Sequence, residues 1–188
     1  MQFWQSHPRV RLCGQAVKRG EVIAYPTEAV WGLGCDPFNR VAVEAILRLK
    51  RRAASKGLII VAASVKQVDF LLEKLSQAQR LQLENSWPGP NTWLVPHFKR
   101  IPPWVSGAST SVAVRVSAHP VVQALCSVYG GPIVSTSANV QAKPPAKTAL
   151  AVRRYFKGCP LVYSPGDIGG REKPSVIRDL LNGQVIRA

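Results

Sequence analysis

Two short clusters of this sequence combine side chains that bind phosphate groups. Lys50-Arg51-Arg52 supplies a point charge and planar guanidinium forks, which together can clamp a triphosphate. The alternative is that these cations complement the negative end of a helix dipole. Ser135-Thr136-Ser137-Ala138-Asn139 brings short hydrogen-bonding side chains together directly after an apolar strand. This second cluster predicts a polar ligand site or, alternatively, a cap or turn at the strand exit.

A third candidate is Arg115, which interrupts the apolar run Val112-Ala113-Val114-Arg115-Val116. A half-buried arginine requires an anion, either a substrate carboxylate or an acidic side chain, unless it faces solvent. Residues 25–34 end a strand in Pro-Thr-Glu and Gly-Leu-Gly, which predicts small polar groups and accessible backbone at a sheet end. Glu28 is the only acid within these motifs. The pattern therefore favours a reaction driven by positioning and charge stabilisation, such as nucleotidyl transfer.

The composition points to anionic partners. The 188 residues include 25 Lys and Arg against 10 Asp and Glu, a net charge of +15, which attracts nucleotides and nucleic acid. The motifs G-x-x-x-x-G-K-[ST] and G-x-G-x-x-G are missing, so dispersed side chains would have to build a phosphate site. Four scattered cysteines without a C-x-x-C pair argue against zinc and disulfides. No apolar run reaches the roughly 20 residues of a membrane span, so we expect a cytoplasmic protein without metal ligands or membrane contact.

Hydrophobic periodicity and turn signals predict helices and strands within one domain, residues 1–188. Helices are expected at 7–20, 40–51, 119–129 and 148–156, with two more after capping-box patterns at Ser64 and Ser76. Strands are expected at 22–25, 58–63, 92–95, 111–116, 132–134, 161–163, 176–177 and 184–187, with Pro96 marking an edge or an end. Strands and helices alternate along the chain, but not in strict βαβ order. We therefore predict an α/β fold: a twisted sheet of mixed parallel and antiparallel strands, flanked by helices.

The motifs, taken in order, resemble those of the YrdC/TsaC-like threonylcarbamoyl-AMP synthases across residues 10–187. They are Tyr25-Pro26-Thr27-Glu28, Lys50-x-Arg52, Lys56-Gly57-Leu58-Ile59, Trp87-Pro88-Gly89-Pro90-x-Thr92, Ala113-Val114-Arg115-Val116, Ser135-Thr136-Ser137-Ala138-Asn139 and Pro174-Ser175-Val176-Ile177-Arg178. Each motif is weak alone, whereas the ordered set is specific. The resemblance implies a YrdC-like fold with a basic concave surface, of the short bacterial type that lacks an extra C-terminal domain.

The resemblance also implies an enzyme, a nucleotidyltransferase that forms threonylcarbamoyl-adenylate and pyrophosphate from L-threonine, bicarbonate and ATP. Mg²⁺ would accompany ATP. Other proteins would transfer the threonylcarbamoyl group to tRNA, and whether this protein itself contacts tRNA or double-stranded RNA is left open. By resemblance, Lys50 and Arg52 are catalytic, and ATP would contact Lys50, Arg52, Ser111, Ser135, Ser137, Asn139 and Arg187. Threonine would contact Thr27, Ser175 and Arg115, the last through its carboxylate.

Two departures from the family pattern affect loops rather than charge. Ala53 replaces the usual proline after Lys-x-Arg, and Asn91 replaces a usually apolar residue. Two alternatives remain open. One is a non-catalytic RNA-binding maturation factor that uses the basic cleft, whose binding would weaken steeply with salt. The other is the carbamoyl-adenylate chemistry of the hydrogenase-maturation carbamoyltransferase, whose C-x-x-C pairs this chain lacks.

Overall fold

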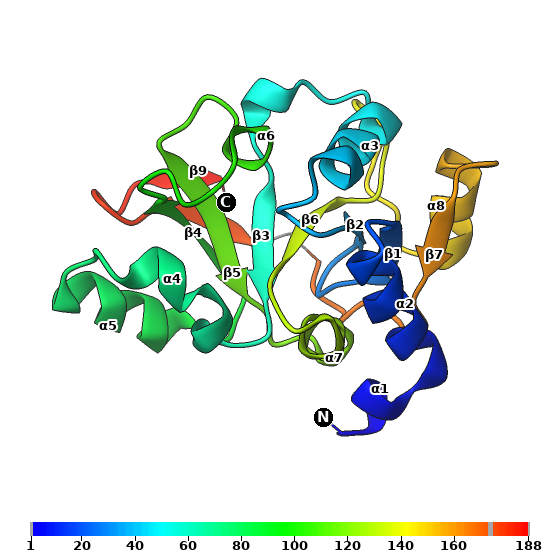
Figure 1. Ribbon diagram of the computed structural model, residues 1–188, viewed down its shortest axis with the longest axis horizontal. Coiled ribbons are helices and arrows are strands. Elements are labelled where there is room, and N and C mark those ends of the chain that lie inside the picture. The colour runs from blue at the N-terminus through cyan, green and yellow to red at the C-terminus, as the bar shows by residue number, and fades with distance from the viewer. Residues whose placement is uncertain (1, 173–174, 188) are drawn as a thin grey trace.

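A twisted sheet joins most elements of this computed structural model, which describes residues 2–172 and 175–187 (Figure 1). Its strands are β1 (Val22–Pro26), β2 (Trp31–Gly34), β3 (Ile59–Ala62), β4 (Asn91–Pro96), β5 (Ser111–Val116), β6 (Ile133–Ser137), β7 (Leu161–Tyr163), β8 (Val176–Asp179) and β9 (Val185–Arg187). Across the described part of the chain they lie in the order β7-β1-β2-β6-β3-β5-β4-β8-β9. The pairs β1/β7, β3/β5 and β4/β8 are parallel and the other neighbours are antiparallel, which confirms the predicted mixed sheet.

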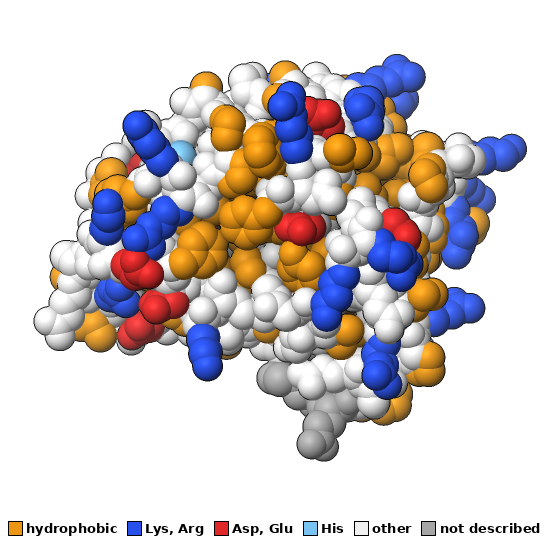
Figure 2. Space-filling model, viewed as in Figure 1, with side chains coloured by type: hydrophobic (Ala, Val, Ile, Leu, Met, Phe, Trp, Pro, Cys, Tyr) orange, Lys and Arg blue, Asp and Glu red, His pale blue; other side chains and the backbone are white. Residues whose placement is uncertain are grey.

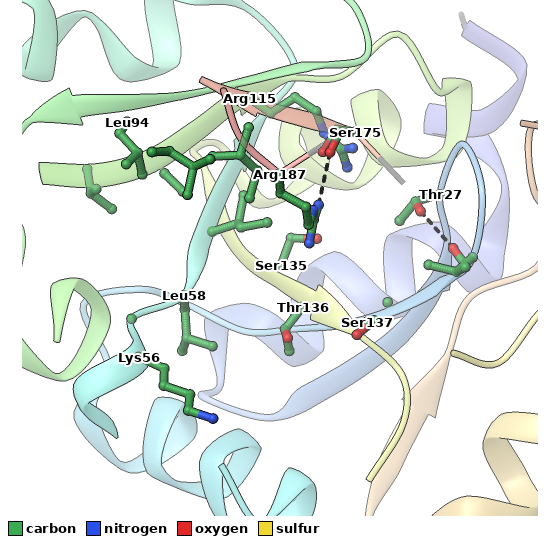
Figure 3. Close-up of a pocket in the computed structure, with 18 of the residues that line it drawn as sticks. Thr27, Lys56, Leu58, Leu94, Arg115, Ser135, Thr136, Ser137, Ser175 and Arg187 are labelled. Carbon is green, nitrogen blue, oxygen red and sulfur yellow. Dashed lines mark hydrogen bonds between the residues drawn. The ribbon is translucent and has the colours of Figure 1, made fainter. Parts of the chain in front are cut away.

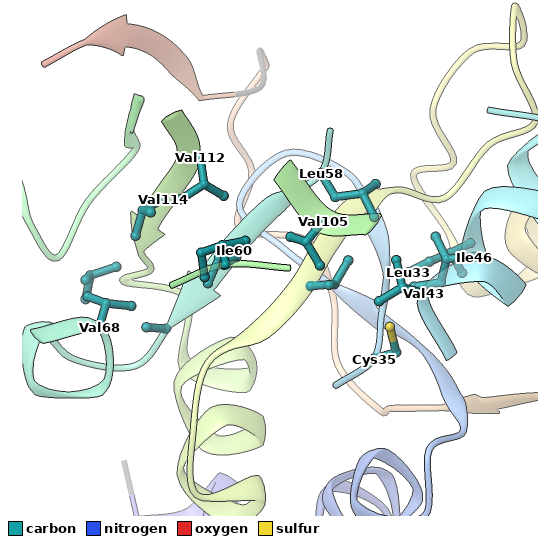
Figure 4. Close-up of a cluster of buried hydrophobic side chains, with 14 of the residues drawn as sticks. Leu33, Cys35, Val43, Ile46, Leu58, Ile60, Val68, Val105, Val112 and Val114 are labelled. Atoms are coloured by element: carbon teal, nitrogen blue, oxygen red, sulfur yellow. The ribbon is translucent and has the colours of Figure 1, made fainter. Parts of the chain in front are cut away.

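Helices cover both faces of this sheet. They are α1 (Gln2–Ser6), α2 (Pro8–Lys18), α3 (Arg40–Lys50), α4 (Asp69–Leu72), α5 (Gln77–Ser86), α6 (Pro103–Ser106), α7 (Pro120–Tyr129) and α8 (Ala149–Tyr155), with 3-10 turns η1 (Ala54–Lys56) and η2 (Val65–Val68). On one face, α3, α4, α5 and α6 enclose a hydrophobic cluster that includes Ile60, Val105 and Val114 (Figure 4). On the other face, α2 and α7 cover Val61 and Ile133. Because neighbouring strand residues point to opposite faces, the apolar run of β3 is buried on both sides, as predicted.

The face covered by α2 and α7 is left open over the middle of the sheet. Ile59 pairs with Ala113 of β5 on one side and with Ser135 of β6 on the other. Leu94 of β4 pairs with Ala113 and extends this row. These residues share the orientation of Val61, which lies two positions further along β3. They form the floor of a cavity, so the alternation that builds the core also presents polar and apolar side chains to a ligand.

Most predicted helices and strands are confirmed, and two differences have clear physical causes. Residues 31–34 form the buried strand β2 rather than accessible backbone. Glycine is required there because a Cβ at Gly34 would lie 2.7 Å from the carbonyl oxygen of Val134. The predicted capping box at Ser76 is present, whereas Ser64 forms no side-chain cap. The side chain of Gln67 accepts a different backbone N–H at 2.8 Å, so it is not available to Ser64.

Three further segments differ from the predictions at least in part. Ser135, Thr136 and Ser137 are the last residues of β6, so the serine cluster lies within a strand rather than after it. Pro96 is the last residue of β4, which confirms the predicted strand end, whereas β4 lies between β5 and β8 and is therefore not an edge strand. Helices α1 and α6 were not predicted, because segments of five residues or fewer give no measurable periodicity.

The surface carries both hydrophobic and basic side chains. On the face shown in Figure 2, hydrophobic side chains occupy the centre and Lys and Arg are spread around them. This face is therefore not uniformly basic, and the predicted basic concave surface stays a prediction. Among residues 2–172 and 175–187, no helix has both the length and the apolar character needed to cross a membrane.

Candidate functional site

The open part of the sheet holds a cavity of about 470 Å³, within the range of small-molecule sites (Figure 3). Leu58 and Leu94 lie toward one end of the view, and Thr27 and Ser137 toward the other. The lining includes most of the predicted site residues: Thr27, Arg52, Ser111, Arg115, Ser135, Ser137, Ser175 and Arg187. Lys50 and Asn139 lie behind this lining and do not contribute to it.

Arg115 lines the cavity and also forms a buried ion pair. Only 8% of its surface is exposed, and its Nη2 lies 3.3 Å from Oε2 of Glu28. The other carboxylate oxygen of Glu28 accepts a 2.6 Å hydrogen bond from the hydroxyl of Ser117. Neither Glu28 Oε2 nor Arg115 Nε has a hydrogen-bond partner among the described residues. The sequence left a salt bridge and a ligand contact open for Arg115, and the structure shows the salt bridge beside the cavity.

A second guanidinium, that of Arg187, stands close to Arg115. Arg187 Nη2 donates to the carbonyl oxygen of Ser175 at 3.0 Å, and Ser175 Oγ lies 2.8 Å from Thr92 Oγ1. Burial, and then the positive charge of Arg115, lower the pKa of Arg187. Glu28 is the one carboxylate near these two cations in the described lining. The excess positive charge makes this end of the cavity suited to an anion.

Lys50 uses its ammonium group to hold the chain that follows β6. It donates to the carbonyl oxygen of Ser137, to the carbonyl oxygen of Asn139 at 2.8 Å and to Asn139 Oδ1 at 3.1 Å. Ser137 Oγ donates to the same Oδ1 at 2.7 Å. Burial, together with the charge of Arg52, lowers the pKa of Lys50 to about 8. Lys50 therefore fixes the backbone of the serine cluster from behind the cavity.

Arg52 reaches a different loop. Its Nη2 donates to the carbonyl oxygens of Gly57 (2.9 Å) and Lys56 (3.3 Å), while its side chain lines the cavity. Burial lowers the pKa of Arg52. Between the two cations, Arg51 caps α3 in the left-handed conformation (φ 52°), which turns the chain away from the helix axis. We had expected Lys50 and Arg52 to point toward the same phosphate groups. In the structure, the side chain of Lys50 instead contacts the segment after β6, and that of Arg52 contacts the η1 turn.

Thr27 belongs to the tight turn between β1 and β2. Its N–H and its hydroxyl both donate to the carbonyl oxygen of Val30, at 3.0 and 2.7 Å. The carbonyl oxygen of Thr27 accepts from the N–H of Gly169, which ties the turn to the segment after β7. The turn therefore presents Thr27 and Glu28 to the cavity in a fixed position.

Sequence reasoning missed several cavity residues. Lys56 and Arg171 add two cations, and Leu94 and Ile177 add apolar surface. Lys56 lay within a recognised motif, and strand alternation from Ala113 outward would have indicated Leu94 and Ile177. Nothing in the local sequence indicates Arg171.

Comparison with known proteins gives consistent results. The family model Sua5_yciO_yrdC, described as telomere recombination, matches residues 15–188. The chain is 56% identical over 188 residues to a protein of Saccharophagus degradans named threonylcarbamoyl-AMP synthase, covering 100% of this chain and 98% of that relative. A protein of the same name from Pseudomonas aeruginosa is 55% identical over 179 residues, covering 95% and 96% of the two chains.

Solved structures agree with this relationship. The P. abyssi Sua5 protein complexed with L-threonine aligns with a TM-score of 0.85 and 30% identity over 94% of this chain. The alignment covers 52% of Sua5, so this chain spans about half the length of that protein. E. coli YciO shares the fold, with a TM-score of 0.81 and 24% identity over 96% of this chain and 90% of YciO. The family model and the relatives that are more than half identical show that this chain belongs to the Sua5/YciO/YrdC family.

Proposed function

We propose that this protein is a threonylcarbamoyl-AMP synthase, a nucleotidyltransferase that joins L-threonine, bicarbonate and ATP into threonylcarbamoyl-adenylate and pyrophosphate. The names of its relatives and the threonine complex of P. abyssi Sua5 support the assignment. The observation that carries it is the cavity itself, whose lining combines Arg52, Arg115 and Arg187 with several hydroxyls and a single carboxylate, that of Glu28, among the described residues. Such a site suits substrates that carry a carboxylate and phosphates.

Threonine would bind at the end of the cavity where Arg115 and Arg187 meet. Their guanidinium groups would receive its carboxylate, and Thr27 and Ser175 would contact the remainder of the amino acid. The buried pair with Glu28 would hold Arg115 in place, because the charged side chain of Glu28 is itself fixed by Ser117. Threonine's nitrogen could then point toward the nucleotide.

ATP would occupy the rest of the cavity. Ser111, Ser135, Ser137 and Arg52 line it and offer hydrogen-bond donors to ribose and phosphate oxygens. Lys50 and Asn139 would contribute by shaping the backbone around Ser137. The apolar end near Leu58 and Leu94 suits a flat, weakly polar base.

In the reaction, the threonine amine forms a bond to the carbon of carbon dioxide with loss of a proton to solvent, or to that of bicarbonate with loss of water, and becomes an N-carboxylate. A carboxylate oxygen forms a bond to the α-phosphorus of ATP, and the bond between that phosphorus and the bridging oxygen of pyrophosphate breaks. The cations around the cavity stabilise the negative charge of the departing pyrophosphate. Mg²⁺ would arrive with ATP as part of the substrate, since such ions are usually bound through phosphates and water. In the described chain no three His, Cys, Asp or Glu side chains lie together as a metal cluster.

The product would pass to proteins that transfer the threonylcarbamoyl group to tRNA. The net charge of +15 favours a second property, binding of tRNA or double-stranded RNA. Salt separates the two activities, because binding to a phosphate backbone weakens steeply as salt rises. The polar cavity and the names of the relatives favour the enzyme over a factor that only binds RNA.

The test is pyrophosphate release from ATP and Mg²⁺, measured with and without L-threonine and bicarbonate. We expect release only when both are present, and we expect Arg52→Ala to abolish it. Pyrophosphate release that does not depend on threonine would overturn the proposal. The absence of pyrophosphate release in a protein that binds RNA in a salt-sensitive way would overturn it too.

A further inference from the structure

A shallow groove adjoins the cavity, beside the ends of β4 and β8 and the start of β5. Its volume is about 370 Å³, and it is lined by residues 96–99, residues 109–111 and Leu181. Ser109 and Ser111 line both the groove and the cavity, whereas the other residues of the groove do not line the cavity. The groove is therefore a separate surface next to the proposed substrate site.

Large apolar side chains are exposed in and beside this groove. Phe98 is 41% exposed and Leu181 is 63% exposed. Val185 and Ile186, on the strand that follows the turn carrying Leu181, are also about half exposed. These four belong to a set of ten large hydrophobic side chains that are exposed in the described part of the chain. Because they come from only two short segments, they indicate an interaction site rather than scattered surface residues.

The loop that carries Phe98 holds two consecutive residues in an unfavourable backbone conformation. Phe98 and Lys99 have φ values of 48° and 63°, in the left-handed region that residues with a Cβ rarely adopt. The N–H of Arg100 donates to the carbonyl oxygen of His97 at 2.7 Å, and Arg100 Nη2 lies 2.6 Å from Oε2 of Glu73. Such residues persist where the surrounding structure fixes them, and they cluster at functional sites. The loop therefore presents Phe98 and Lys99 in a fixed position.

Positive charge lies at the rim of the groove. The ammonium of Lys99 has no hydrogen bond or ion pair with any residue in 2–172 or 175–187, and Lys74 Nζ lies 5.5 Å from the centre of the Phe98 ring. The carboxylate of Glu73 is already paired with Arg100. The described lining of the groove contains no Asp or Glu. An apolar groove with available lysines is complementary to an acidic segment that carries an apolar side chain.

Two other occupants fit these groups less well. A second copy of this chain would bring the same lysines toward each other, and each copy carries a net charge of +15. RNA could contact the lysines and stack on Phe98, but the aliphatic side chains of Leu181 and Val185 offer it neither stacking nor charge. A protein segment can use both the apolar and the cationic groups.

We propose that this groove docks an acidic segment of the protein that consumes the threonylcarbamoyl-adenylate. The proposal rests on the proposed function, and it concerns a surface outside the substrate site. The product is a mixed anhydride that water hydrolyses, so a partner docked beside the cavity would limit its loss. Phe98 and Leu181 would bury an apolar side chain of the partner, and Lys74 and Lys99 would contact its carboxylates.

The test measures binding to each purified protein of the same organism that transfers the threonylcarbamoyl group to tRNA, by interferometry at fixed salt. We expect one of them to bind the wild type, and to bind Phe98→Asn more weakly by about tenfold or more, the effect of losing a buried aromatic anchor. Asparagine adopts the left-handed conformation more readily than phenylalanine, so the Tm of this variant should equal or exceed that of the wild type. Lys99→Glu should weaken binding too. Leu12→Ser, at a similarly exposed position on α2, is the matched control and should bind as wild type.

No binding to any of these proteins, or equal binding by the wild type and Phe98→Asn, would overturn the proposal. A wild-type dimer that Phe98→Asn dissociates, measured by light scattering, would overturn it in favour of a second copy. Loss of salt-sensitive RNA binding in Phe98→Asn would overturn it in favour of RNA. Failure of the proposed function would look different, since the wild type alone would release no threonine-dependent pyrophosphate. Phe98→Asn should release it at the wild-type rate, because Phe98 does not line the cavity.

Discussion

Replacing Arg115 by methionine should destabilise the protein as well as weaken threonine binding. The change leaves the carboxylate of Glu28, whose side chain is 13% exposed, with Ser117 as its hydrogen-bond partner in the described chain. Removing one member of a buried pair costs about 3–5 kcal/mol. At 3.3 Å and without a hydrogen bond, this pair belongs near the lower end, so we expect a loss of about 3 kcal/mol. In a chain of this length that corresponds to a Tm lower by about 6–12 °C.

A double-mutant cycle isolates the interaction. Glu28→Gln keeps an oxygen that can accept from Ser117 but removes the charge opposite Arg115. In the double variant neither an unpaired carboxylate nor an unpaired guanidinium remains. We therefore expect its loss of stability to be smaller than the sum of the two single losses, by about 1–3 kcal/mol.

Urea unfolding gives the free energies for this cycle, and calorimetry gives the ligand affinities. Arg115→Met should lose threonine affinity while it keeps ATP affinity within about twofold. Additive stability losses would show that Glu28 and Arg115 do not interact. Unchanged threonine affinity would remove Arg115 from the amino acid site.

Two other predictions concern the framework around the cavity. Since the pKa of Lys50 is lowered from 10.5 to about 8, the folded protein releases this proton at a pH where the unfolded chain still holds it. The free energy of unfolding of the wild type, relative to that of Lys50→Met, should therefore rise between about pH 8 and 10.5, by at most about 1.4 kcal/mol per pH unit. A difference in Tm between the two proteins that stays constant across this pH range would refute the lowered pKa of Lys50. Gly34→Ala should cost about 1–3 kcal/mol, because the new Cβ would stand 2.7 Å from the carbonyl oxygen of Val134. Gly131→Ala, whose Cβ would meet only the ring of Tyr129 at 3.4 Å, is its control, and equal losses in urea unfolding would contradict the packing argument.

Local sequence patterns were sufficient to predict most of the fold. The apolar run of β3 and the alternation of β5 reflect burial that the final sheet provides. The Ser76 capping box was predictable because its partners are three residues apart. Strand β2 could not be predicted, because its glycines are required by close contacts with β6, a strand that follows about a hundred residues later in the sequence.

The site could be predicted as a set of residues but not as a set of contacts. Arg115 was indicated by its place in an apolar strand, whereas its pairing with Glu28 depends on how the β1–β2 turn meets the end of β5. Lys50 and Arg52 are two residues apart, so their spacing suggested a common target. Arg51, between them, has a left-handed backbone conformation, which directs the two side chains to different loops. Arginine has no preference for this conformation, so the sequence does not predict it. Lys56 belongs to a recognised motif, but nothing in that motif indicates that its side chain lines the cavity.

The most direct test of the proposed function is the identity of the product. The protein would be incubated with ATP, Mg²⁺, L-threonine and ¹³C-bicarbonate, and the mixture analysed by mass spectrometry. We predict threonylcarbamoyl-adenylate carrying one ¹³C atom, formed together with an equal amount of pyrophosphate. Pyrophosphate without a labelled adduct, or an adduct that forms equally well without threonine, would contradict the assignment.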